Sequence, residues 1–111
     1  MLHDYVAICQ ELVLKRVDRD KYAVFLFGSR ARNTHFPKSD IDVGLWGREK
    51  VDALTMLDLQ DVFDESIIPY KVDLVDFSYT DESFRRVALK NIVVWNNPPA
   101  FHWPYQNSSA P

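Results

Sequence analysis

The sequence predicts a single domain of mixed helices and strands, α/β in its element order and α+β in the broader sense, in which helices cover a sheet. Segments with helical spacing of apolar residues alternate with short strand-like segments, in the order α-β-α-β-α-β-α-β. The chain has 111 residues, 47% of them hydrophobic and 14% aromatic, which is enough apolar material for a single core. The pattern leaves open the strand order and the number of antiparallel pairs.

The first elements lie on either side of a Gly-Ser pair. Apolar residues fall on one stripe over residues 4–17, which predicts a covering helix. Residues 22–27 form a nearly continuous apolar run, typical of a strand buried on both faces, and the run ends at Gly28 and Ser29. A short helix is expected through residues 30–32.

The middle of the chain contains two further strands separated by a helix. Residues 40–46 alternate between apolar and polar or small side chains, which predicts a strand. Apolar residues recur at helical spacing over residues 51–67. Residues 70–77 then predict a third strand.

The last elements are a helix and a strand. Thr80 precedes two acidic residues and is expected to cap the helix, whose apolar face would be formed by Phe84, Val87 and Ala88. Residues 92–95 return to a strand pattern.

We expect one domain over residues 1–97 and a C-terminal tail over residues 98–111. The tail lacks periodicity but is rich in aromatic residues, so it either docks on the core, a partner or a second copy, or is a disordered end. Its aromatic stretch comprises Phe101, His102, Trp103, Pro104 and Tyr105.

Charge and composition argue against several classes of protein. The net charge is -3 and no long block of Lys or Arg occurs, so tight nucleic-acid binding is not expected. Cys9 is the single cysteine, which rules out an intrachain disulfide and leaves it a small core residue. The longest apolar run, residues 22–27, is too short to cross a membrane, and the N-terminus does not resemble a signal peptide, so a cytoplasmic protein is expected.

Three carboxylates on two predicted strands form a candidate metal site. Asp40 and Asp42 are two residues apart on a strand, so both leave the same face and can share a hard cation. Asp73 lies within an apolar run, where an unpaired charge is costly unless it faces a cleft or a metal, and it is also the candidate general base. Asp76 is expected on the opposite face, as a turn or cap residue.

The turn after the first strand is a candidate phosphate site. Gly28 would let the backbone approach a phosphate, and Ser29 would add its hydroxyl and amide at a helix start, although most Gly-Ser pairs are ordinary turns. Helical periodicity turns Arg30 and Arg32 to different sides, so one of them, with Arg30 preferred, is expected to meet phosphate. His35 is expected to be a surface residue.

Two other side chains have alternatives that the sequence leaves open. Lys71 is expected on the strand face of Asp73, either contacting phosphate or solvated. Trp46 either stacks on a base or packs in the core.

Three motif segments together resemble the minimal nucleotidyltransferase family. They are Phe27-Gly28-Ser29-Arg30-Ala31-Arg32, Ser39-Asp40-Ile41-Asp42-Val43 and Val72-Asp73-Leu74-Val75-Asp76-Phe77. The resemblance covers residues 22–95 and implies a polymerase-β-like fold with a mixed sheet, ATP as donor and Mg²⁺ held by the three aspartates. It also implies the antitoxin half of a toxin-antitoxin pair, which adds AMP to a tyrosine of a helical HEPN-type ribonuclease toxin.

The leading hypothesis is therefore a protein adenylyltransferase. A chain of 111 residues has no room for an acceptor-holding domain, so another protein, or a second copy in a homo-oligomer, would present the acceptor. Two alternatives remain: a non-catalytic module that neutralises its partner by occlusion, and a nucleotidyltransferase that acts on a small molecule or an RNA end. The preference for a nucleotide base is not predicted.

Overall fold

Helices and strands alternate as predicted in residues 4–103, which the computed structural model describes. The elements are α1 (Tyr5–Leu14), β1 (Ala23–Phe27), α2 (Gly28–Ala31), β2 (Ile41–Trp46), α3 (Ala53–Asp64), β3 (Val72–Asp76), α4 (Glu82–Ala88) and β4 (Val93–Asn96). Each predicted element is present, with ends that differ by a few residues from the predicted segments. Helix α2 begins two residues earlier than predicted, and β4 is shifted by one residue.

The strands form one mixed sheet in the order β3-β2-β1-β4. Strand β1 is antiparallel to both β2 and β4, whereas β2 and β3 are parallel. The parallel pair places the beginnings of β2 and β3 at the same edge of the sheet, where the antiparallel β1 ends. The predicted aspartates and the Gly-Ser pair therefore meet at one edge.

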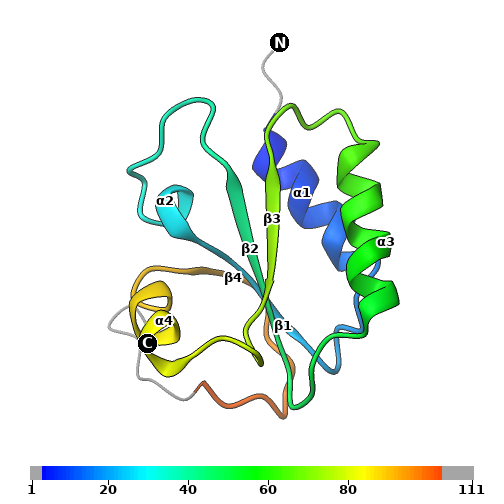
Figure 1. Ribbon diagram of the computed structural model, residues 1–111, viewed down its shortest axis with the longest axis vertical. Coiled ribbons are helices and arrows are strands. Elements are labelled where there is room, and N and C mark those ends of the chain that lie inside the picture. The colour runs from blue at the N-terminus through cyan, green and yellow to red at the C-terminus, as the bar shows by residue number, and fades with distance from the viewer. Residues whose placement is uncertain (1–3, 104–111) are drawn as a thin grey trace.

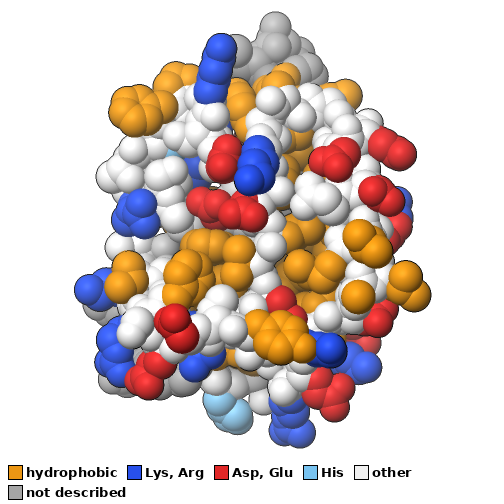
Figure 2. Space-filling model, in the orientation of Figure 1, with side chains coloured by type: hydrophobic (Ala, Val, Ile, Leu, Met, Phe, Trp, Pro, Cys, Tyr) orange, Lys and Arg blue, Asp and Glu red, His pale blue; other side chains and the backbone are white. Residues whose placement is uncertain are grey.

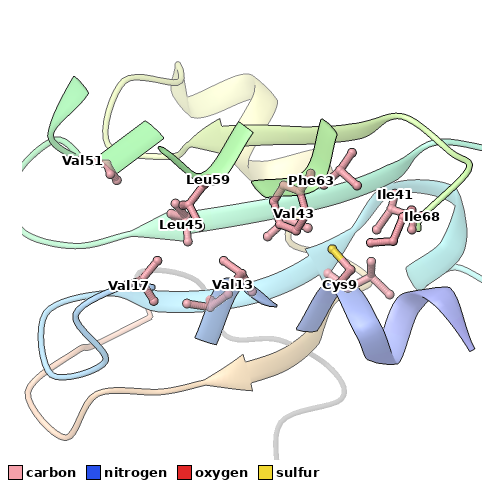
Figure 3. Packing of buried hydrophobic residues seen from close by; sticks show 13 residues of the cluster. Cys9, Val13, Val17, Ile41, Val43, Leu45, Val51, Leu59, Phe63 and Ile68 are labelled. Carbon is pink, nitrogen blue, oxygen red and sulfur yellow. The ribbon is translucent and has the colours of Figure 1, made fainter. Parts of the chain in front are cut away.

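One face of the sheet is covered by α1 and α3, which lie together on the same side (Figure 1). These helices pack an aliphatic core against β2, because alternate residues of that strand point toward them. Side chains from the three elements converge in Figure 3, and they include Cys9, Val13, Leu59, Phe63, Ile41, Val43 and Leu45. Cys9 is a core residue as predicted, and burial raises the pKa of its thiol to about 12.

The opposite face carries the short helices α2 and α4 and an aromatic core. Phe25 and Phe77 are fully buried there, with ring centroids 4.8 Å apart in an edge-to-face contact. Gly44 makes this packing possible, because a Cβ at that position would overlap the rings of both phenylalanines.

Two details of α4 differ from the prediction. The helix is capped by Asp81, whose carboxylate accepts a 2.7 Å hydrogen bond from the Phe84 amide, while the Thr80 hydroxyl donates to the Phe77 carbonyl. Asp81 is a better cap than Thr80, because its carboxylate accepts from a free amide of the first turn and its negative charge interacts favourably with the positive end of the helix. Val87 is 64% exposed, so the predicted apolar face is wrong at that residue.

The beginning of the tail docks on the aromatic core. Trp103 lies edge-on to Phe25 at 5.4 Å, and Phe101 lies 5.5 Å from Trp46, measured between ring centroids. The packed chain thus continues beyond residue 97 to Trp103, and the rest of the predicted tail, which includes Pro104 and Tyr105, lies outside the described residues. Within residues 4–103, every helix is too short or too polar to cross a membrane.

Candidate active site

The candidate site is built on the paired beginnings of β2 and β3. Asp42 and Asp73 are direct partners in the parallel ladder, so their side chains leave the same face next to each other. Asp42 is also the partner of Phe27, the last residue of β1. Asp40 is exposed and lies one residue before β2, where no ladder pairing fixes it.

Gly28 lies directly against Asp42. Its φ is +75°, a backbone conformation that residues with a Cβ rarely adopt. A Cβ on Gly28 would also overlap the Oδ2 atom of Asp42. Glycine is therefore required at this position for two reasons, the positive φ of the turn and the contact with the carboxylate. The sequence predicts only a close approach of the backbone to phosphate.

Negative charge is concentrated at Asp42. The pKa of its carboxyl is raised from the usual 3.8 to about 6, first by burial and then by the negative charges of Asp73 and Asp40. The charges of Arg32 and Lys71 act in the opposite direction. Acidic side chains gather in the middle of the face shown in Figure 2, beside basic side chains.

The donor chemistry of this cluster fits a hard divalent cation. Asp42 and Asp73 offer carboxylate oxygens, the ligands that Mg²⁺ prefers, and a cation between them would relieve their mutual repulsion. In residues 4–103 no three His, Cys, Asp or Glu side chains already converge as a complete ligand set. Of the three predicted aspartates, Asp42 and Asp73 are thus held side by side by strands, and Asp40 is close enough to raise the pKa of Asp42.

The turn formed by Gly28 and Ser29 lies immediately beside Asp42. Helix α2 begins at Gly28, and the preceding Phe27 has no side-chain oxygen that could cap its first amides. The Ser29 carbonyl accepts a 2.9 Å hydrogen bond from the Thr34 amide, which closes the loop after the helix. Ser29 thus lies at the start of a short helix, as the sequence predicts, and directly follows the glycine that lies against Asp42.

Arg30 is directed away from this turn. Its guanidinium donates hydrogen bonds to the carbonyls of Ser39, Asp40 and Pro37, the shortest being 2.8 Å to Ser39. It also lies 4.9 Å from the ring centroid of Tyr70. The role of Tyr70 has no signal in the sequence, since nothing in a single aromatic residue before a strand indicates a stacked arginine.

Asp76 and Trp46 make structural contacts, and His35 lies at the surface. Asp76 accepts hydrogen bonds from the Val51 amide at 2.7 Å and from the Ser78 amide and hydroxyl, which confirms its turn role. Trp46 packs against Phe77 and the tail, so the packing alternative holds. His35 is exposed in the loop before β2.

Solved structures with a similar fold come from toxin-antitoxin complexes. A chain of a crystal structure described as a toxin-antitoxin with AMP-PNP matches with a TM-score of 0.64 and 21% identity, covering 85% of this chain and 73% of that chain. A chain of the complex between a tri-AMPylated Shewanella oneidensis HEPN toxin and an MNT antitoxin matches with a TM-score of 0.57 and 17% identity, covering 80% and 70%. At these identities the likeness concerns the fold.

Sequence comparisons give the family. A protein of Haemophilus influenzae named "Probable protein adenylyltransferase MntA" is 38% identical over 73 residues, a match that spans 66% of this chain and 64% of the relative's length. The family model described as "Polymerase beta, Nucleotidyltransferase" matches residues 13–99, which include all three motif segments. This chain belongs to the polymerase beta nucleotidyltransferase family.

Proposed function

We propose that this protein is a Mg²⁺-dependent nucleotidyltransferase that transfers AMP from ATP to a tyrosine of a partner HEPN-type ribonuclease toxin in the cytoplasm, and so acts as its antitoxin. One observation carries the proposal: Gly28, at the phosphate turn, touches the carboxylate of Asp42, which pairs in register with Asp73. Phosphate-binding backbone and metal-binding oxygens are therefore adjacent, as transfer from a triphosphate requires.

The metal ligands in this proposal are Asp42 and Asp73, with Asp40 as the third. Bound there, Mg²⁺ would neutralise charge on the triphosphate and orient the reacting oxygens. Ser29 and the first amides of α2 would hold the phosphates. Arg32 and Lys71, whose charges already act on Asp42, would neutralise the pyrophosphate as it leaves.

The acceptor in this proposal is a tyrosyl hydroxyl supplied by the partner. Its oxygen would attack the α-phosphorus, the bond from that phosphorus to the bridging oxygen would break, and pyrophosphate would depart. Asp73 would also accept the hydroxyl proton, because β3 holds its carboxylate in place beside Asp42. Asp42 and Asp73 are each partly exposed, so a hydroxyl of a partner could reach them.

The comparisons support the proposal in two ways. The relative from Haemophilus influenzae bears the name of a protein adenylyltransferase. The structures with a similar fold are toxin-antitoxin complexes, one with AMP-PNP and one with an AMPylated HEPN toxin.

The test is the intact mass of the protein that copurifies with this chain. The partner is incubated with ATP and Mg²⁺ in the presence of the wild type, of Asp42→Asn and of Arg19→Gln, the last being an exposed substitution in the turn before β1. We expect the partner to gain one or more AMP units with the wild type and with Arg19→Gln, and none with Asp42→Asn or without Mg²⁺. If the bound partner gains no mass with the wild type, neutralisation by occlusion replaces the proposal.

A further inference from the structure

Arg30 fixes the segment that carries Asp40. Its Nε atom lies 3.2 Å from the Ser39 carbonyl oxygen and 3.3 Å from that of Asp40, and its Nη2 atom lies 2.8 Å from Ser39 O and 3.4 Å from Pro37 O. One guanidinium thus joins three carbonyls within four consecutive residues. A planar group with several donors at fixed angles suits such a contact, whereas a lysine ammonium does not.

The three carboxylates of the site differ in how they are held. Asp42 and Asp73 lie inside strands and are partners in the ladder. Asp40 lies outside the sheet, and the ladder begins only at Ile41, whose amide donates to the Lys71 carbonyl at 2.9 Å. The backbone carbonyl of Asp40 is instead held by Arg30.

Tyr70 holds the guanidinium in place from the other side. The Arg30 guanidinium lies 4.9 Å from the centroid of the Tyr70 ring, and Tyr70 in turn meets Tyr5 of α1 edge-on at 5.6 Å. The guanidinium therefore lies between the Tyr70 ring and the loop before β2. Stacking on Tyr70 restricts the rotamers of the Arg30 side chain, which lowers the conformational entropy that its hydrogen bonds to the carbonyls cost.

We propose that Arg30 is a positioning residue that sets the place of the Asp40 carboxylate, with Tyr70 as its stacking support, and that it does not bind phosphate. The inference rests on the proposed metal role of Asp40. It replaces the phosphate contact expected for Arg30 from the sequence and assigns that task to the Arg32 side of the turn. Groups that orient metal ligands from behind are worth about 10- to 100-fold in metal affinity.

The first experiment measures Mn²⁺ binding to the nucleotide-free protein by electron paramagnetic resonance. Arg30→Gln removes the fork, Arg30→Lys keeps the charge, and Arg19→Gln is the matched control at an exposed arginine of the turn before β1. We expect about tenfold weaker Mn²⁺ binding in both Arg30 variants and no change in the control. Because ATP is absent, a phosphate ligand would leave these affinities unchanged.

The second experiment is hydrogen exchange of the same proteins without metal, which shows whether each variant remains folded. Arg30→Gln should speed exchange in peptides covering residues 33–41 and leave those from β1 and α3 unchanged. Tyr70→Leu should give a smaller increase in the same peptides, and Tyr70→Phe, which keeps the ring, should behave as the wild type.

The results that overturn the inference differ from those that overturn the proposed function. Full Mn²⁺ affinity in both Arg30 variants would refute the positioning role. An Arg30→Gln variant whose only defect is a higher KM for ATP would instead make Arg30 a phosphate ligand. Unchanged exchange over residues 33–41 in Arg30→Gln would also contradict it. A wild type that binds no Mn²⁺ and transfers no AMP refutes the proposed function, and the exchange data then still decide whether Arg30 holds the loop.

Discussion

The two faces of the sheet are built from the same strands but in different ways. One face is sealed by α1 and α3, of 10 and 12 residues, over an aliphatic core. The other carries the short helices α2 and α4, of 4 and 7 residues, together with the aromatic core and the carboxylates. Alternation along β2 separates the two, since Ile41 and Val43 point to the closed face and Asp42 to the open one.

This difference separates stability from chemistry. On the closed face, apolar burial supplies much of the folding free energy. On the open face, Asp42 is held at a cost, because burial and neighbouring acids raise its pKa. Substitutions on the closed face should therefore lower stability, whereas substitutions in the acidic cluster should lower activity and leave stability equal or higher.

The largest expected effect is the loss of transfer in Asp42→Asn. Removing a metal ligand should lower the transfer rate by about a thousandfold, equivalent to about 4 kcal/mol, because the charge on the phosphates is no longer matched. Transfer of radiolabelled AMP to the partner measures this. Activity within tenfold of the wild type would remove Asp42 from the site.

The next effect concerns the closed face and compares two leucines of α3. Leu59 is fully buried and Leu57 is 62% exposed. Leu59→Ala should lower the free energy of unfolding by about 3 kcal/mol, because it leaves a cavity in the aliphatic core, whereas Leu57→Ala should change it by less than about 0.5 kcal/mol. Urea unfolding of both variants measures the difference, and equal values would contradict the assignment of the core.

Gly28→Ala should disturb both properties at once. The new Cβ would be strained at a φ of +75° and would displace the Asp42 carboxylate. We expect a loss of about 2 kcal/mol in stability and of about tenfold to a hundredfold in transfer. Unfolding and transfer assays on the same sample measure both losses. A variant with normal activity would show that the contact between Gly28 and Asp42 has no importance for the reaction.

The smallest effect is the pH dependence of stability without metal. The pKa of Asp42 is about 6 in the folded protein and 3.8 ordinarily, so the folded protein holds a proton that the unfolded chain releases between these values. Stability from this group is therefore lost as pH rises through about 6. Asp42→Asn should match the wild type near pH 4 and exceed it by about 1–2 kcal/mol at pH 7.5, after allowance for solvent screening.

Urea unfolding at both pH values, in chelator, measures this gap. A wild type that is more stable than Asp42→Asn at pH 7.5 without metal would contradict the raised pKa.

The fold follows from local patterns in the sequence. Alternation along β2, the apolar run of β1 and the helical spacing in α1 and α3 each predict an element that the structure contains. The prediction failed at Val87 and at the cap of α4, because a seven-residue helix contains too few residues to show which side faces the core. The mixed sheet order depends on pairing between distant segments, which periodicity does not indicate.

The candidate site was predictable in its acids and less so in its supporting residues. Spacing predicts Asp40 and Asp42 on one strand face, whereas the structure places Asp40 one residue before β2. The structure adds that Asp73 is the direct partner of Asp42. The overlap of Gly28 with a carboxylate, and the direction of Arg30, depend on distances between residues far apart in the chain. Such contacts have no local signal.

The central claim is that the open face holds a metal-dependent nucleotide site at Asp42 and Asp73. Its most direct test is the thermal unfolding temperature with a non-hydrolysable ATP analogue, with and without Mg²⁺, for the wild type and for Asp73→Asn. We predict a rise for the wild type that requires Mg²⁺, corresponding to about 2.7 kcal/mol at a hundredfold excess over Kd, and no such rise for the variant. An equal rise in both proteins, or one that does not need Mg²⁺, would contradict the account.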